Sequence, residues 1–184
     1  QEWEDQNKFR DILAPADGII TRIEMVGGRQ NDYRMIIHHT CTFYTIYIHA
    51  RELPPKITKV IEGKRSIETG IPITAGEVIG RANGFDFSVH NDEAVLKGFV
   101  IPEHYQEPWK IHTVDMFEYF IEPIKSQLLV RNIRQKEPRS GKIDYDIDGK
   151  LIGNWFLEGN GGYQNGPGNY WVKHLSFVYN TLDP

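Results

Sequence analysis

Short runs of alternating apolar and polar residues dominate the N-terminal half of the chain. They are rich in Ile, Tyr and Phe, and Gly, Pro and Asn-Asp pairs separate them. A period of two places the apolar side chains on one face of a strand, so these runs predict a strand-rich region. The runs are GIITRIEM (18–25), YRMIIHH (33–39), TFYTIYIHA (42–50) and GEVIGRA (76–82).

The pattern changes over residues 115–133, where apolar residues recur in steps of three and four, as on one face of a helix. Asp115 and Glu118 have the spacing of an N-terminal capping box. Pro123 should break or kink the helix, because an interior proline loses a hydrogen bond and clashes with the preceding turn. We therefore expect one helix or two in this segment.

Alternation returns in the C-terminal part of the chain, in residues 142–147, 150–159 and 170–179, with a Gly/Asn-rich loop between the last two runs. The expected fold class is therefore mainly β. We expect a β-sheet or barrel-sandwich domain over residues 1–110. A short helical segment and a C-terminal β-hairpin lobe that packs on this domain are expected over residues 111–184.

Composition and net charge exclude several classes of partner and site. A chain of 184 residues with 40% hydrophobic content can bury a sizeable core. The net charge of −4, with both signs mixed along the chain, gives no basic footprint, so no nucleic-acid partner is expected. No apolar run approaches the roughly 20 residues of a membrane helix, so membrane insertion is not expected either. The single cysteine, Cys41, rules out an internal disulfide and a cysteine zinc cluster.

Four segments stand in an order that resembles the lysostaphin-type zinc endopeptidases, the duplicated hybrid motif fold. They are APADGIITRIE, YTIYIHA, TAGEVIGRA and GFDFSV, and the resemblance covers about residues 14–92. The chain is also similar to a group of uncharacterised secreted proteins that combine an APADG turn, an FDF strand and a GNWF segment. The resemblance implies a lysostaphin-like β domain and an extracellular or cell-envelope location.

The resemblance also implies roles for particular residues. His49 takes the place of a histidine that assists the attacking water, whereas Asp86 and Gly84 stand where the family keeps a metal-binding and a catalytic histidine. The family's first two ligands lie upstream of the APADG turn, and QEWEDQNKFRDIL contains no histidine. His90 follows Asp86 on the same strand face, about 13 Å away if the strand is extended. Catalytic zinc takes three protein ligands, so a metal site at Asp86 and His90 is incomplete and a pseudoenzyme is expected.

The stretch DYDIDG (144–149) begins like a calcium loop, with acids at its first, third and fifth positions. However, Trp155 replaces the bidentate glutamate, and Asp-Gly between alternating runs favours a two-residue hairpin turn. The hairpin would place three acids on one solvent face that binds a hard cation weakly, with the neighbouring apolar side chains inward. These acids are Asp144, Asp146 and Asp148.

Aromatic residues cluster in the C-terminal strands and loop, where they either pack in the core or offer rings for a sugar or a partner protein. The candidates for ligand binding are Trp155, Tyr163, Tyr170 and Trp171.

The function we expect is a non-catalytic, extracellular or envelope-associated binding or assembly module derived from a zinc peptidase fold. Its partners would be a cell-wall or glycan ligand, or further copies of the chain joined through strand edges. No cofactor is expected. The alternative is a metal-dependent hydrolase of peptide or glycan that uses zinc or calcium. In that case His49, Asp86 and His90 form part of the site, and an absent segment or a neighbouring subunit supplies the rest.

Overall fold

The computed structural model describes residues 8–27, 30–105, 107–165 and 172–182. The fold is mainly β, as the alternation predicts. The chain forms two compact units, Gln1–Asn91 and Asp92–Pro184. Residues 92–110, which were expected in the N-terminal domain, belong to the second unit, because they make most of their contacts with residues that follow Asn91.

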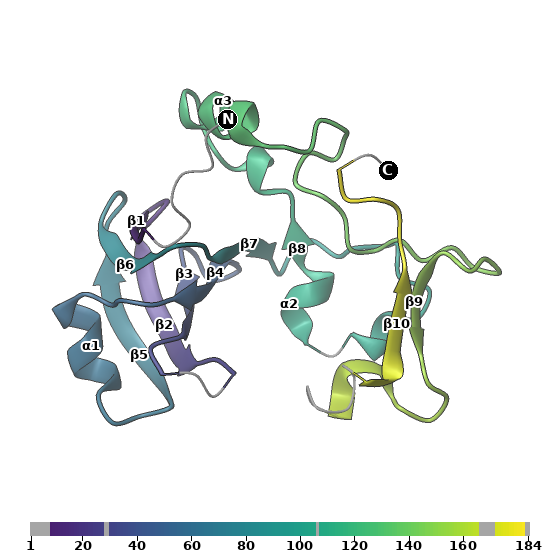
Figure 1. Cartoon of the computed structure of the whole chain (residues 1–184), viewed down its shortest axis with the longest axis horizontal. Helices are drawn as coiled ribbons and strands as arrows, with labels where there is room; N and C mark the ends of the chain where they lie inside the picture. The colour runs from purple at the N-terminus through teal and green to yellow at the C-terminus, as the bar shows by residue number, and fades with distance from the viewer. Residues whose placement is uncertain (1–7, 28–29, 106, 166–171, 183–184) are drawn as a thin grey trace. The chain divides into compact units, whose positions relative to one another are not determined.

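The first unit is built on an antiparallel sheet with the strand order β5-β2-β3-β4-β7 (Figure 1). The predicted runs become β2, β3 and β4, and each strand begins or ends within one residue of its run. Alternation sets the inner face, because Met35 lies opposite Ile23 on one side and Tyr47 on the other. The strands are β2 (Gly18–Met25), β3 (Tyr33–His38), β4 (Phe43–Ala50), β5 (Ser66–Ile73) and β7 (Asp86–Asn91).

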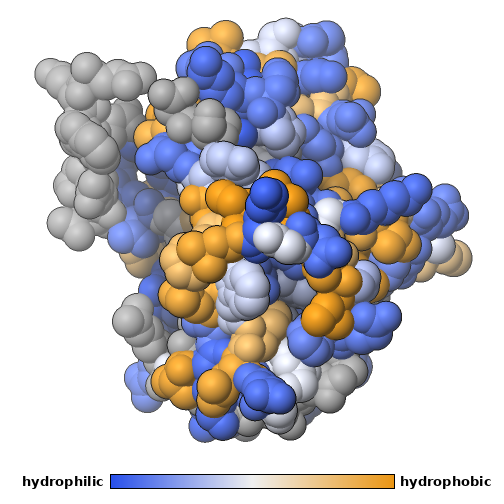
Figure 2. Space-filling model, turned by 90° about the vertical axis from the view of Figure 1, so that its right-hand side faces the viewer, coloured by the Kyte–Doolittle hydropathy of each residue, from blue (hydrophilic) through white to orange (hydrophobic). Residues whose placement is uncertain are grey.

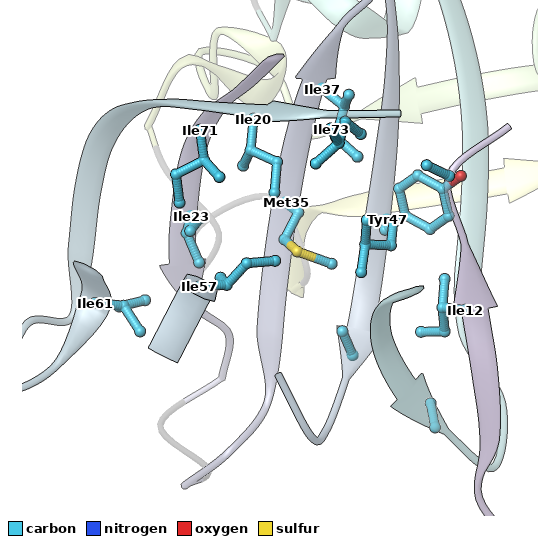
Figure 3. Close-up of a cluster of buried hydrophobic side chains, with 14 residues drawn as sticks. Ile12, Ile20, Ile23, Met35, Ile37, Tyr47, Ile57, Ile61, Ile71 and Ile73 are labelled. Carbon is cyan, nitrogen blue, oxygen red and sulfur yellow. The ribbon is translucent and has the colours of Figure 1, made fainter. Parts of the chain in front are cut away.

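The inner face of this sheet packs against a second, two-stranded sheet and a short helix. The antiparallel pair consists of β1 (Arg10–Leu13) and β6 (Val78–Ala82), and the helix is α1 (Pro55–Ile61). Figure 3 shows the isoleucine-rich cluster between these elements. The described strands do not close into a barrel. The first unit is therefore an open sheet packed against a smaller one, and not a closed barrel.

Two elements of the first unit are not predicted by the alternation of apolar and polar residues. Helix α1 is a short segment that starts with proline at its first position, where the missing N–H costs nothing. Strand β5 contains Gly70 and Pro72, which interrupt its pattern. Proline fits there because β5 is an edge strand that pairs with β2 alone among the described residues.

The described part of the second unit consists of short helices, the two-residue strand β8 and two further short strands, β9 and β10, that form a hairpin-like pair (Figure 1). Strand β9 (Gly153–Phe156) pairs antiparallel with β10 (His174–Phe177), within two of the predicted runs. The other elements are η1 (Pro102–His104), α2 (Pro108–Ile111), β8 (Thr113–Val114), η2 (Met116–Glu118), α3 (Ile124–Arg131) and η3 (Gly162–Asn165).

The predicted break at Pro123 is confirmed. The helical pattern over residues 115–133 becomes η2 and α3, and Pro123 is the residue that precedes α3. The Asp115 carboxylate accepts a hydrogen bond from the Phe117 amide at 2.8 Å, so it caps η2. The segment therefore contains two helices instead of one.

Hydrophobic and hydrophilic patches alternate on the surface drawn in Figure 2. The largest exposed fractions among the apolar side chains of the second unit belong to Val130, Val172, Ile121 and Ile133. None of the described helices is long and apolar enough to cross a membrane.

Candidate functional sites

His49 occupies a strained position at the end of β4. Arg34 pairs with Ile48 and Tyr33 pairs with Ala50, so His49 is the extra residue of a β-bulge. Its φ is +78°, in the left-handed region that side chains other than glycine seldom adopt. Such strain is concentrated at functional sites, because the surrounding structure must hold it in place.

Two aspartates lie on the two sides of the His49 ring. Nδ1 lies 3.0 and 3.2 Å from the carboxylate oxygens of Asp32, and Nε2 lies 3.8 Å from Oδ2 of Asp86. An ionised carboxylate only accepts, so Nδ1 carries the hydrogen in this contact, and the neutral ring then keeps a lone pair on Nε2. Asp32 is buried and is also paired with Arg51 Nη1 at 3.2 Å, whereas the side chain of Asp86 is 74% exposed. The ring is therefore fixed from its buried side and presents Nε2 towards solvent and Asp86.

This arrangement does not amount to a catalytic metal centre. Asp32 and Asp86 face opposite nitrogens of one ring, so all three groups cannot bind the same ion. Within the described part of the chain, no three His, Cys, Asp or Glu side chains are placed to hold a metal. His49 Nε2 and Asp86 supply two donors at most, whereas catalytic zinc takes three protein ligands.

The structure places His90 away from this pair. Its side chain is buried, stacks on Tyr44 with ring centroids 5.0 Å apart, and has Nε2 2.8 Å from the hydroxyl of Ser88. Because Asp86 pairs with Ile48 whereas His90 pairs with Tyr44, the two residues lie at opposite ends of β7. The predicted metal pair of Asp86 and His90 is therefore not formed.

Sequence reasoning missed Asp32. It belongs to the Asn-Asp pair that served only as a turn signal between the runs of β2 and β3. A single acid next to a turn gives no signal of its own. Its pairing with His49 depends on the β3–β4 register, which brings the start of one strand beside the end of the other.

In the second unit, the predicted turn at Asp148 and Gly149 is formed, but the predicted solvent face of acids is wrong. The Lys150 amide donates to the Ile147 carbonyl, and Gly149 has a φ of +71°. However, Asp144 is buried, whereas Ile143 and Ile147 are exposed. No strand forms over residues 142–147, so the side chains do not alternate between two faces as they would along a strand.

The acids of this stretch bind backbone amides instead of forming a shared cation face. Asp144 accepts from the Gly98 amide at 2.8 Å, and Asp146 accepts from the amides of Val100 and Asn154 at 3.1 and 2.9 Å. These contacts link residues 98–100 to the turn and to β9. Asp148 remains exposed. The role of Asp144 and Asp146 is therefore to hold chain segments together.

An open cavity of about 490 Å³ lies within the second unit. This volume is in the range of small-molecule sites, which combine apolar walls with a few polar groups. Tyr163, one of the candidate ligand aromatics, lines the cavity. Trp155 lines a neighbouring cavity of about 190 Å³, whereas Tyr170 and Trp171 lie outside the described residues. Further lining residues are Phe99, Tyr105, Lys110, Arg134, Asn154 and His174.

A hydrogen-bonded group around His174 forms one wall of this cavity. The ring contacts the Tyr163 hydroxyl through Nδ1 at 3.2 Å and Asn154 Oδ1 through Nε2 at 3.1 Å, and it stacks on Phe156. Burial, and secondly the charge of Lys110, lower the pKa of His174. The neutral ring is favoured in the folded protein, and β9 and β10 hold it in place.

Tyr105 lines both cavities and carries a buried hydroxyl. The residue is 4% exposed, and its hydroxyl has no hydrogen-bond partner among the described residues. Burial, and secondly the charge of Asp146, raise its pKa, so the hydroxyl is protonated and offers a donor. The Asn154 side chain, which partly opposes this rise, is not positioned to make the hydrogen bond. An unpaired buried hydroxyl is costly, and a bound ligand would remove this cost.

No sequence pattern indicates that Tyr105, Asn154 and His174 form a group. These residues come from three separate segments, and packing of the second unit brings them together. Comparison with known proteins does not identify the site, because no family model, no curated protein and no solved structure matches this chain.

Proposed function

We propose that this protein is a non-catalytic binding module whose second unit takes up a carbohydrate ligand. The observation that carries this proposal is the buried hydroxyl of Tyr105, which has no hydrogen-bond partner among the described residues and belongs to a side chain that lines a 490 Å³ cavity. The cavity also offers aromatic rings and the amide of Asn154, the two kinds of group that contact the faces and the hydroxyls of a sugar ring. An extracellular or envelope-associated location agrees with a cell-wall or glycan ligand.

Replacing Tyr105 by phenylalanine tests this proposal. We expect Tyr105→Phe to weaken binding of an oligosaccharide about tenfold, the equivalent of one lost hydrogen bond of about 1.4 kcal/mol. The free energy of unfolding should stay unchanged or rise, since the variant removes a buried hydroxyl that has no partner. Wild type and variant are screened on an array of neutral and acidic oligosaccharides, and calorimetry then gives the affinity of each hit.

Tyr119→Phe is the matched control, because Tyr119 is exposed and does not line the cavity. It should leave the affinity unchanged. A wild-type protein that binds no oligosaccharide would overturn the proposal. So would equal losses of affinity in the two variants.

The alternative function is a metal-dependent hydrolase. The hydrogen bonding of the His49 ring favours this alternative. A carboxylate on Nδ1 and a free lone pair on Nε2 are common around histidine metal ligands. The metal would need a further donor besides Asp86, from a segment or subunit outside the described residues.

Metal analysis separates the two functions. Under the binding proposal, we expect zinc well below one ion per chain after incubation with zinc and dialysis. His49→Ala and Asp86→Ala should not change this content, and Glu52→Ala serves as an exposed carboxylate control. Stoichiometric zinc that both site variants release, with the control unaffected, would favour the hydrolase.

Self-assembly through strand edges remains a proposal. In the first unit, β5 is the edge strand to which a further copy of the chain would add. This strand uses one side to pair with β2 within the described residues. Pro72 and the exposed side chain of Glu68 lie on it, and prolines and charges protect edges against strand addition. The sequence of this edge therefore favours glycan binding over assembly as the main function.

A further inference from the structure

The charged side chains that line the cavity of the second unit are all cationic. Three of its lining side chains are cationic, namely Lys110, Arg134 and Lys142, and none of the lining residues is Asp or Glu. The chain as a whole is acidic, with a net charge of −4, so the charge of these lining side chains is opposite to the net charge of the protein. A cavity lined by one sign of charge concentrates ligands of the other sign.

Of the three cations, Arg134 is the one without a counter-ion among the residues that the structure describes. It is 4% exposed, and its guanidinium donates to the backbone carbonyls of Pro138, Thr181 and Glu137. No carboxylate lies within ion-pair distance of it in the described ranges. These three bonds use three of the five N–H groups of a guanidinium, which leaves two for a ligand. Carbonyl dipoles solvate the charge but do not neutralise it, and arginine stays charged even when buried.

The other two cations are partly compensated. Lys110 Nζ lies 2.9 Å from the Glu107 carboxylate and 3.4 Å from the centroid of the Tyr163 ring. Lys142 Nζ lies 3.8 Å from Asp144 Oδ1. The two lysines therefore add little net charge to the cavity, whereas Arg134 offers the buried, directional donors that suit a carboxylate.

We propose that the ligand of this cavity is an acidic sugar, in which a carboxylate pairs with Arg134. The sugar ring lies against the aromatic wall and a hydroxyl meets Tyr105. This inference rests on the proposed function and specifies the substrate class of the same cavity. Uronic acids are one class of sugar that carries a ring and a carboxylate in one unit.

Calorimetry with two trimers tests this inference. A galacturonic acid trimer and a galactose trimer share their ring and differ in the carboxylate. We expect the acidic trimer to bind 10- to 100-fold more tightly, as a charge-assisted hydrogen bond contributes about 1.5–3 kcal/mol. Raising the salt concentration should reduce this preference, since ions screen the attraction.

Arg134→Gln should remove most of the preference, and Arg134→Lys should keep part of it because the charge remains. Arg131→Gln is the control, since Arg131 is exposed and does not line the cavity. If Arg134→Gln does not fold, as judged by its melting curve, the salt dependence and the wild-type preference decide the question. Equal affinity of the wild type for both trimers would overturn the acidic-sugar inference and leave the proposed function standing. Binding of neither trimer, together with an empty oligosaccharide array, would overturn both.

Discussion

Replacing Ile20 by alanine is expected to lower the free energy of unfolding by about 2–5 kcal/mol. Ile20 is fully buried in β2, opposite Ile37 and Ile71 on the two neighbouring strands (Figure 3). Truncation removes three methyl or methylene groups from a packed cluster and leaves a cavity that the surrounding strands fill only in part. Urea denaturation followed by circular dichroism measures the loss.

Ile19→Ala is the matched control for this prediction. Ile19 precedes Ile20 in the same strand but is 47% exposed, because successive side chains point to opposite faces of the sheet. Its truncation should cost about 1 kcal/mol or less. Similar costs for the two substitutions would contradict the register of β2 and the position of the core.

Replacing Gly98 by alanine is expected to destabilise the second unit by about 3 kcal/mol. A Cβ atom at this position would overlap with the backbone oxygen and the carboxylate of Asp144. Gly98 also donates to Asp144 and accepts from the Asp146 amide, so the two segments cannot separate without losing both bonds. Asp146 in turn holds Asn154 at the cavity, and oligosaccharide binding should weaken together with stability.

Gly84→Ala provides the comparison, because a Cβ atom there would meet no other atom within 4 Å. It should change the free energy of unfolding by less than about 1 kcal/mol. Thermal melting and calorimetry of both variants give the two readouts. A Gly98→Ala protein as stable as Gly84→Ala would show that segments 98–100 and 144–146 are not packed as described.

The strand core of the first unit was predictable from the sequence. Residues 18–25, 33–39 and 42–50 alternate, and each became a strand whose apolar side faces the core. Alternation predicts these strands because the sheet buries only one of its faces, so every second residue along a strand is apolar. The break at Pro123 was predictable for an equally local reason, the missing N–H of proline.

The same reasoning failed at residues 142–147, where acids and apolar residues also alternate. Here the Asp144 and Asp146 carboxylates bind backbone amides of residues 98 and 100, and these bonds draw the acids inward. Hydrogen bonds to a distant segment determine the conformation here, and not the alternation of polar and apolar residues, because a carboxylate can accept from several amides at once. No pattern within the stretch itself reports such contacts.

The candidate sites were predictable only in part. His49 and Asp86 do approach each other, but the register of β4 and β7 separates Asp86 from His90, and Asp32 joins through the β3–β4 pairing. The resemblance to zinc endopeptidases, the glycan ligand and the cell-envelope location remain proposals.

By itself, the sequence determined a mainly β chain, the strands around the isoleucine core, the helix break at Pro123 and the Asp-Gly turn, because each depends on neighbours along the chain. Only the tertiary structure decided which polar groups meet. It joined Asp32 to His49 and, as far as the described ranges extend, buried Arg134 without a counter-ion and left the Tyr105 hydroxyl without a hydrogen-bond partner. The physical reason is that a hydrogen bond or an ion pair depends on distances of a few ångströms between residues far apart in sequence, and those distances are set by packing.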